Sequence, residues 1–220
     1  MKNILILYHT RHGQTQKISE YIATNLSVNF KVTLQNINTL IDQTIPEQVV
    51  DDQALDHLQL DHPRKYDLIV LACPIYYGHH DSFISKLMLK NAPLLERIPC
   101  AFFSVNLTAR KALKSDPNNN PYLLKFLKTL TFKPKLIAVF AGKLQYPSYG
   151  FFDKLMIQFI MKITQGVTDT SKIIEYTDWN KVDNFCNLIA SNLNESNLNE
   201  SNLNTNNLNT NNLNTNNLTE

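Results

Sequence analysis

The chain opens with a strand, a polar loop and a helix, and this unit limits the choice of fold more than any other segment. Residues 3–8 are a short apolar run that ends at polar residues around Gly13. Residues 15–26 place apolar side chains at helical spacing, with Thr10 and Thr15 as candidates for the loop and the helix cap. The N–H groups that begin such a helix are unpaired and favour an anion, so the sequence predicts a phosphate site.

The loop itself indicates which phosphate compound is bound. It has neither the Walker pattern G-x-x-x-x-G-K-[ST] nor the dinucleotide fingerprint G-x-G-x-x-G. Hydroxyl residues at both ends with one glycine between resemble the flavodoxin phosphate loop, which binds the phosphate of FMN. The alternative is an ordinary strand-to-helix turn without a ligand, and His12 stands where flavodoxins commonly carry a hydroxyl residue. The candidate FMN-binding residues here are Thr10, Arg11, His12, Gly13, Gln14 and Thr15.

Four more segments of strand length follow, and helical patterns separate them. They are residues 30–37, 67–73, 100–105 and 136–141, with one helix predicted over 82–95. Alternating strands and helices predict an α/β fold with helices on both faces of a parallel sheet. We expect a flavodoxin-like sheet of five parallel strands in the order 2-1-3-4-5.

Ligands of such sheets bind beyond the carboxyl ends of the strands. Tyrosines, glycines and a proline stand at these ends, where they predict an aromatic-lined slot for a flat heterocycle, with core or rim packing as the alternative. The candidate cofactor-binding residues at these ends are Pro74, Ile75, Tyr76, Tyr77, Gly78, Asn106, Leu107, Gly142 and Tyr146.

Length and cysteine usage limit the class of protein. With 220 residues, 43% of them hydrophobic, the chain can bury one sizeable core. Cys73, Cys100 and Cys186 lie far apart and form no C-x-x-C pair, so neither a disulfide framework nor a metal site is predicted. There is no signal-peptide pattern and no apolar stretch of the roughly 18 residues that would span a bilayer.

Positive charge is concentrated in the middle of the chain. Residues 97–172 hold twelve Lys or Arg against three Asp or Glu, although the whole chain has a formal net charge of only +2. Such a segment attracts an anionic partner: nucleic acid, an acidic lipid surface or a polycarboxylate substrate. The alternative is a solvated basic face without a partner.

The C-terminal part of the chain holds two helical patterns and a repeat. Residues 151–163 are predicted as a core helix, with a helix lying at a membrane interface as the alternative. Residues 178–190 are predicted as the closing helix. Residues 191–220 repeat a five-residue unit with so little apolar surface that we predict a disordered tail, against a pentapeptide-repeat β-helix. Residues 38–65 are polar and show no periodicity.

Several segments together resemble one flavodoxin-type family over about residues 2–190. They read YHTRHGQT, PIYYGHHDSF, FFSVNLTARK, AGKLQYPSY and TDTSKIIEYTDW. They are similar to the bacterial protoporphyrinogen oxidases that pass electrons to menaquinone or another quinone, such as ubiquinone. We expect a single domain over residues 1–190, and the resemblance implies that residues 108–134 are a family insertion. It also implies FMN, protoporphyrinogen IX, haem biosynthesis and a peripheral position on the cytoplasmic face of the inner membrane.

The chemistry of that reaction suggests further candidates. His79 and His80 follow a turn and are weak candidates for proton acceptors, with solvent-facing loop histidines as the alternative. Arg110 and Lys111 are candidates for the propionates of the substrate or for lipid phosphates. An anionic membrane surface is an expected partner, nucleic acid is not, and a homodimer is left open. The competing functions are a flavodoxin electron carrier and an FMN-dependent NAD(P)H:quinone reductase.

Overall fold

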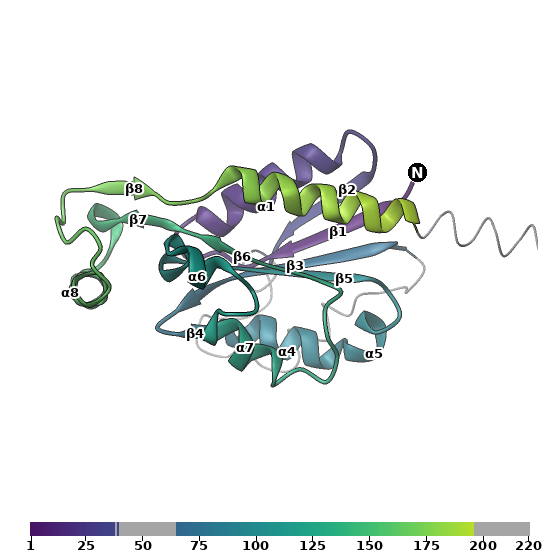
Figure 1. The fold of residues 1–220 in the computed structure, drawn as a ribbon. Coiled ribbons are helices and arrows are strands. Elements are labelled where there is room, and N and C mark those ends of the chain that lie inside the picture. Colours follow the sequence, from purple (N-terminus) through teal and green to yellow (C-terminus); the bar gives the residue numbers. More distant parts are fainter. Residues whose placement is uncertain (38, 40–64, 196–220) are drawn as a thin grey trace, which may run out of the picture.

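The computed structural model describes residues 1–37, 39 and 65–195 (Figure 1). Apart from residues 39 and 65, the polar segment 38–65 lies outside these residues. Of the predicted disordered tail over 191–220, residues 196–220 lie outside them as well. The sheet strands are β1 (Asn3–Tyr8), β2 (Lys31–Asn36), β3 (Leu68–Tyr76), β5 (Cys100–Asn106) and β6 (Leu136–Ala141). The helices beside the sheet are α1 (Gln14–Leu26), α4 (Ser82–Lys90), α5 (Ala92–Leu95) and residues 179–195.

These five strands are parallel and lie in the order β2-β1-β3-β5-β6, which confirms the predicted order 2-1-3-4-5. Side chains alternate between the two faces, so Ile4 and Ile6 belong to one core cluster and Leu5 and Leu7 to the other. In Figure 1, α1 and the closing helix cover one face and α4, α5 and α7 (Pro121–Leu127) cover the other. The sheet therefore carries helices on both faces, as predicted.

The predicted helix over 82–95 is wrong in one respect, because it breaks at Asn91 into α4 and α5. The Asn91 side chain donates to the carbonyl of Leu87, and its backbone ends α4 outside helical geometry. Pro93 then lies in the first turn of α5, where its missing N–H costs nothing. The break turns the chain toward β5.

Strand β3 runs three residues further than predicted and enters a tight hairpin. Its last residue, Tyr76, pairs with His79 of the short antiparallel strand β4 (His79–His80). The two residues of the turn both have positive φ, 49° at Tyr77 and 79° at Gly78, as a type I′ hairpin requires. A tyrosine is rare in this conformation, so the surrounding contacts must hold it there.

The predicted insertion, residues 108–134, packs into the core. It contains most of the 3₁₀ helix η1 (Leu107–Arg110), α6 (Ala112–Ser115) and α7. Asn120 begins α7 by accepting hydrogen bonds from the N–H groups of Tyr122 and Leu123. Leu123 and Phe126 of α7 are buried in the cluster that also holds α4.

Helix α8 (Phe151–Ile163) is not the core helix that the sequence predicts. Only Ile157 and Met161 of this helix are buried, against a small cluster formed by β7 (Lys143–Gln145) and η2 (Tyr146–Ser148). Strand β8 (Ile173–Glu175) pairs with β7, and α8 lies at the outer end of the molecule, beyond the covered sheet (Figure 1). Both faces of the sheet are already covered, so α8 has little left to pack against. Within the described ranges, no helix is long and apolar enough to cross a bilayer.

The closing helix continues past the predicted domain end at residue 190. Residues 179–195 are helical, so the first five-residue repeat belongs to the folded domain. Leu193 is 1% exposed in the core cluster of α1, and its carbonyl accepts a hydrogen bond from Lys2. The leucine of the first repeat therefore belongs to the core, although the other residues of the repeat are polar and do not indicate burial.

Candidate functional site

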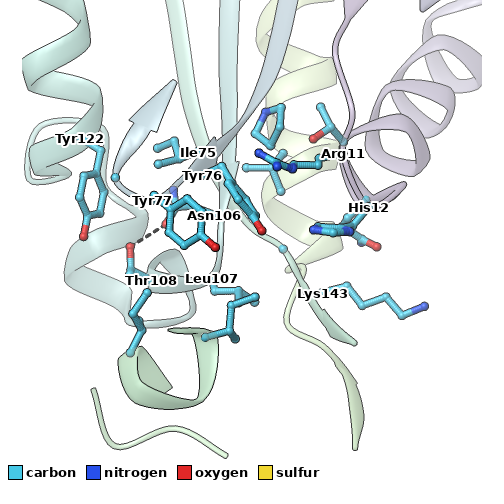
Figure 2. A pocket seen from close by; sticks show the side chains of 18 of the residues that line it. Arg11, His12, Ile75, Tyr76, Tyr77, Asn106, Leu107, Thr108, Tyr122 and Lys143 are labelled. Atoms are coloured by element: carbon cyan, nitrogen blue, oxygen red, sulfur yellow. Dashed lines mark hydrogen bonds between the residues drawn. The ribbon is translucent and has the colours of Figure 1, made fainter. Parts of the chain in front are cut away.

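A cavity of about 500 Å³ opens at the carboxyl ends of β1, β3, β5 and β6 (Figure 2). Residues of α8 form one of its walls. The structure brings together there most of the residues that the sequence singled out. These are Thr10, Arg11, His12, Gln14, Thr15, Pro74, Ile75, Tyr76, Tyr77, Gly78, Asn106, Leu107 and Gly142. Gly13 and Tyr146 are not among the lining residues.

The loop before α1 has the backbone geometry of an anion site. Gly13 begins the helix with a φ of 80°, and no side chain of the described residues caps the helix start. Thr15 lies in the first turn, so its predicted role as a cap is wrong. The Thr10 hydroxyl instead accepts a hydrogen bond from the Gly13 N–H at 3.1 Å. An anion placed at this helix start would interact with the positive end of the α1 dipole.

The buried side chain of Gln14 fixes this loop to the far side of the site. Its amide nitrogen donates to Thr177 at 2.8 Å and to Glu175 at 3.2 Å. Gln145 of β7 also donates to the carbonyl of His12, at 2.9 Å. The loop is thus held in place by β7, β8 and the residues after β8.

Aromatic and cationic groups form the next part of the wall. The Arg11 guanidinium lies 3.6 Å from the centre of the Tyr76 ring, within cation–π range. The imidazole of His12 lies between two tyrosines, with ring centres 4.9 Å from Tyr149 and 5.9 Å from Tyr76. Burial and the nearby Arg11 charge lower the pKa of His12, which favours a neutral imidazole at pH 7.

Two buried side-chain nitrogens of the lining have no hydrogen-bond partner in the part of the chain that the structure describes. They are Nδ2 of Asn106 and Nε2 of His12. Oδ1 of Asn106 is fully used, because it accepts from the Thr108 hydroxyl (Figure 2) and also from the Ala109 N–H. The amide is therefore oriented with Nδ2 as the unpaired donor, which is available to an acceptor in the cavity, either a ligand or a water.

The β3–β4 hairpin and α8 meet at the mouth of the cavity. The hydroxyl of Tyr77 donates to the carboxylate of Asp153 in the first turn of α8. Met156, Ile157 and Ile160 of α8 line the cavity beyond this contact. The mouth is thus apolar on its α8 side and polar on its phosphate-loop side.

Tyr146 does not stand beside the phosphate loop, as the sequence suggested. It is fully buried in the cluster under α8, and its hydroxyl donates to the carbonyl of Val167 at 2.9 Å. Tyr149, three residues later, lines the cavity in its place. The 3₁₀ turn η2 begins at Tyr146, and the tyrosine that follows the turn, Tyr149, faces the cavity.

The two histidines proposed as proton acceptors lie outside the cavity lining. His80 stacks on Phe126 of the insertion at 4.3 Å, and burial lowers its pKa to about 4. His79 is exposed on the other side of the hairpin strand. His80 therefore acts as a core aromatic residue that holds the insertion against the hairpin.

Arg110 is not free to bind a substrate carboxylate. Its guanidinium donates to the carbonyl of Leu107 at 2.9 Å and to the hydroxyl and carbonyl of Thr164 at 2.7 and 3.1 Å. It thereby ties η1 to the end of α8, and it lines a separate crevice of about 210 Å³. Lys111 is exposed and lies outside the cavity lining.

Sequence reasoning missed several lining residues. Lys143 and Tyr149 follow β6 and could have been found by extending the search along that strand end. Tyr122 belongs to the predicted insertion, and the α8 residues belong to a helix predicted to lie in the core. None of these residues directly follows a strand of the sheet, so a search of the strand ends does not find them. The missed residues are Val105, Thr108, Tyr122, Lys143, Tyr149, Met156, Ile157 and Ile160. Among the described residues no cluster of His, Cys, Asp or Glu could hold a metal ion.

Comparison with known proteins identifies the family. Residues 33–171 match the model of a flavodoxin domain. The chain is 39% identical over 187 residues to the protoporphyrinogen IX dehydrogenase [quinone] of Escherichia coli K12, an alignment that covers 84% of this chain and 93% of that protein. This chain belongs to the flavodoxin-type protoporphyrinogen IX dehydrogenase family. A Leishmania major protein of the same name is also 39% identical over 187 residues, covering 85% of this chain and 74% of its own.

This family is one of oxidoreductases, and this chain of the family contains a flavodoxin domain. Among solved structures, the FMN-bound flavodoxin of Fusobacterium nucleatum aligns with a TM-score of 0.32 and 17% identity over 64% of this chain and 72% of that one. The WrbA-like flavodoxin of Agrobacterium tumefaciens aligns with a TM-score of 0.36 and 20% identity over 59% of this chain and 73% of that one.

Proposed function

We propose that this chain binds FMN and oxidises protoporphyrinogen IX to protoporphyrin IX in haem biosynthesis, with menaquinone or ubiquinone as the electron acceptor. The observation that carries the proposal is the 39% identity to the dehydrogenases of that name over nearly the whole domain. The cavity at the carboxyl edge of the sheet supplies a site of suitable chemistry.

The lining residues fit FMN. The loop at residues 10–15 would hold the phosphate, because its helix start carries no side-chain cap within the described residues. The unpaired Nδ2 of Asn106 and Nε2 of His12 offer hydrogen-bonding groups for the heteroatoms of a ring system. Ile75 and Leu107 provide apolar contact for it. When bound, FMN supplies the capacity to accept two electrons at a time.

The reaction balances with a quinone as acceptor. Protoporphyrinogen IX loses six electrons and six protons to become the aromatic porphyrin, and three quinones take up two of each to become quinols. No side chain has to form a covalent bond with the substrate. The role of the protein is to bind and orient the reactants and to exclude water from the cavity.

Two cations of the cavity, Arg11 and Lys143, replace Arg110 and Lys111 as the groups proposed to bind the propionates. Both line the cavity, whereas Arg110 is bonded within the chain and Lys111 lies outside the lining. In Figure 2, Arg11 and Lys143 both lie on the side of the site where His12 stands. A planar guanidinium suits a carboxylate especially well.

We also propose a peripheral position on an anionic membrane surface, at the cytoplasmic face of the inner membrane. The excess of basic residues over 97–172 supports this location, since each basic residue near an anionic leaflet contributes about 1 kcal/mol. The quinone is an apolar molecule that partitions into lipid, and the porphyrinogen has a large apolar ring system beside its charged propionates.

Anaerobic mixing of the FMN-loaded protein with one reductant at a time tests this function. Protoporphyrinogen IX should bleach the flavin absorbance within seconds, while NADH should leave it unchanged. Rapid bleaching by NADH alone would favour a quinone reductase. Failure of both would leave an electron carrier, and a protein that takes up no FMN would contradict the proposal at its first step.

A further inference from the structure

Helix α8 exposes a continuous ridge of large apolar side chains. Phe152 is 82% exposed, Phe151 71%, Ile163 65%, Phe159 60%, Leu155 51% and Met156 44%, and these six residues are here called the α8 ridge. With 3.6 residues per turn, they fall on one side of the helix, opposite the buried pair Ile157 and Met161. A cluster of this kind on a folded domain marks a site of interaction.

The ridge is held outward by contacts of the rest of the helix. The opposite face is fixed by burial of Ile157 and Met161, and Gln158 donates to the carbonyl of Thr168 at 3.0 Å. Asp153 accepts from Tyr77 at the first turn, and Arg110 bonds Thr164 just after the last. Rotating α8 to bury the ridge would break these contacts, so its exposure is a feature of the folded domain.

The same helix also forms a wall of the proposed FMN cavity. Met156 belongs both to the ridge and to the cavity lining, and Ile160 lines the cavity one turn further on. The apolar surface therefore runs from the outside of α8 into the cavity without a charged residue between Met156 and Ile160. An apolar molecule could pass along it without being surrounded by water.

Charge distinguishes between the two occupants that such a ridge could have. Lys162 is exposed among the ridge residues, and the one acidic residue of α8, Asp153, is bonded to Tyr77. Two copies meeting ridge to ridge would bring lysines of like charge together. Anionic lipid headgroups would instead attract them, and a 13-residue helix of this kind is suited to lie in the interface rather than span it.

We infer that the α8 ridge inserts into the surface of an anionic bilayer, and that a lipid-dissolved quinone enters the cavity past Met156 and Ile160. The entry step rests on the proposed reaction with a quinone, whereas the insertion deepens the proposed membrane position and does not depend on the reaction. The ridge then places the cavity mouth at the level of the headgroups, where the long apolar tail of a quinone can stay in lipid while its ring reaches the site.

Vesicle partitioning of the full chain tests the insertion. The double variant Phe152→Gln with Phe159→Gln should bind vesicles of phosphatidylglycerol and phosphatidylcholine at least tenfold more weakly than the wild type. The matched control, Val28→Gln with Leu188→Gln, removes residues that are 76% and 55% exposed elsewhere and should bind as the wild type does. Lys162→Gln should weaken binding about fivefold, the equivalent of about 1 kcal/mol, and only to anionic vesicles.

Equal partitioning of both double variants would overturn the insertion. A wild-type dimer that the Phe152 and Phe159 changes convert to a monomer, without any vesicle binding, would overturn it in favour of a second copy as the occupant.

Reoxidation of the photoreduced FMN form tests the entry step independently of porphyrinogen. Long-tailed ubiquinone in vesicles should reoxidise the double variant Phe152→Gln with Phe159→Gln at least tenfold more slowly than the wild type. A short-chain, water-soluble ubiquinone should reoxidise the two proteins at the same rate. Equal slowing with both quinones would contradict entry from lipid. If reoxidation follows this pattern while porphyrinogen is not oxidised at all, the inference stands and the substrate of the proposed function is wrong.

Discussion

The hydroxyl of Tyr77, at the tip of the β3–β4 hairpin, donates a hydrogen bond to Asp153 in the first turn of α8. It joins two segments that lie 76 residues apart in the chain, and it does so across the mouth of the cavity. The positive φ of Tyr77 is part of the same arrangement, because it aims the side chain from the turn toward α8. The hydrogen bond to Asp153 also raises the pKa of Tyr77.

Removing this hydrogen bond should loosen the start of α8 without unfolding the domain. We expect Tyr77→Phe to cost less than about 1 kcal/mol of global stability, since both partners are near the surface. Amide hydrogen exchange over residues 151–156 should become faster, while exchange in β3 stays unchanged. Asp153→Asn should have a similar effect, and the double variant should add little to either; additive effects would show that the two side chains do not act together.

Stability below pH 6.5 should depend on His80. Its pKa is about 4 in the folded protein, so the unfolded chain, with a pKa near 6.5, binds the proton more readily and stability falls as pH drops between these values. The contribution should be about 2 kcal/mol between pH 7 and pH 5. His80→Phe keeps the stacking on Phe126. In this variant the denaturation midpoint should change less with pH over this range than it does in the wild type. The exposed neighbour serves as the control, and a His79→Phe protein that shows the same flattening would contradict the assignment.

The position of the true domain end can be measured by truncation. A chain that ends at residue 195 should be as stable as the full chain, within the roughly 0.5 kcal/mol typical of exposed sites. A chain that ends at residue 190 loses the buried Leu193, and Leu193→Ala alone should cost about 2–4 kcal/mol in urea denaturation. Leu188→Ala, at a side chain that is 55% exposed, is the matched control and should change stability little. Equal midpoints for the two truncations would restore the domain end at residue 190.

Asn106 should affect cofactor binding more than folding. Asn106→Asp keeps the oxygen that accepts from Thr108 and Ala109 and replaces the unpaired Nδ2 donor by a second acceptor with negative charge. We expect the dissociation constant of FMN to rise at least tenfold, because a lost hydrogen bond to a buried donor costs about 1–3 kcal/mol. Fluorescence titration of the apoprotein measures this, and its melting temperature without FMN checks the fold. Unchanged FMN affinity would remove Asn106 from the binding site.

The sheet could be predicted from the sequence because each strand is a compact apolar run bounded by polar residues, and a parallel sheet fixes where its carboxyl ends meet. Tyr146 and Tyr149 show the limit of that rule: both follow β6, and only the turn between them decides which one faces the cavity. Arg110 illustrates the same limit, since its partner Thr164 lies 54 residues away. No local pattern reveals such a contact.

The prediction that α8 lies in the core is wrong for a different reason. Apolar periodicity predicts a buried face, yet it does not say whether the rest of the molecule has a surface left to cover it. Here other helices occupy both faces of the sheet, and most of the apolar side chains of α8 face outward. Leu193 is the opposite case, because a repeat of polar composition conceals one side chain that the core uses.

Anaerobic turnover with and without a quinone shows whether this chain oxidises protoporphyrinogen IX at the expense of a quinone. The FMN-loaded protein is mixed with excess protoporphyrinogen IX, and porphyrin fluorescence is followed before and after adding menaquinone or ubiquinone. We expect porphyrin to accumulate continuously only when a quinone is present, with three quinols formed for each porphyrin. Equal rates with and without quinone, or rates no higher than those of heat-killed protein, would contradict it.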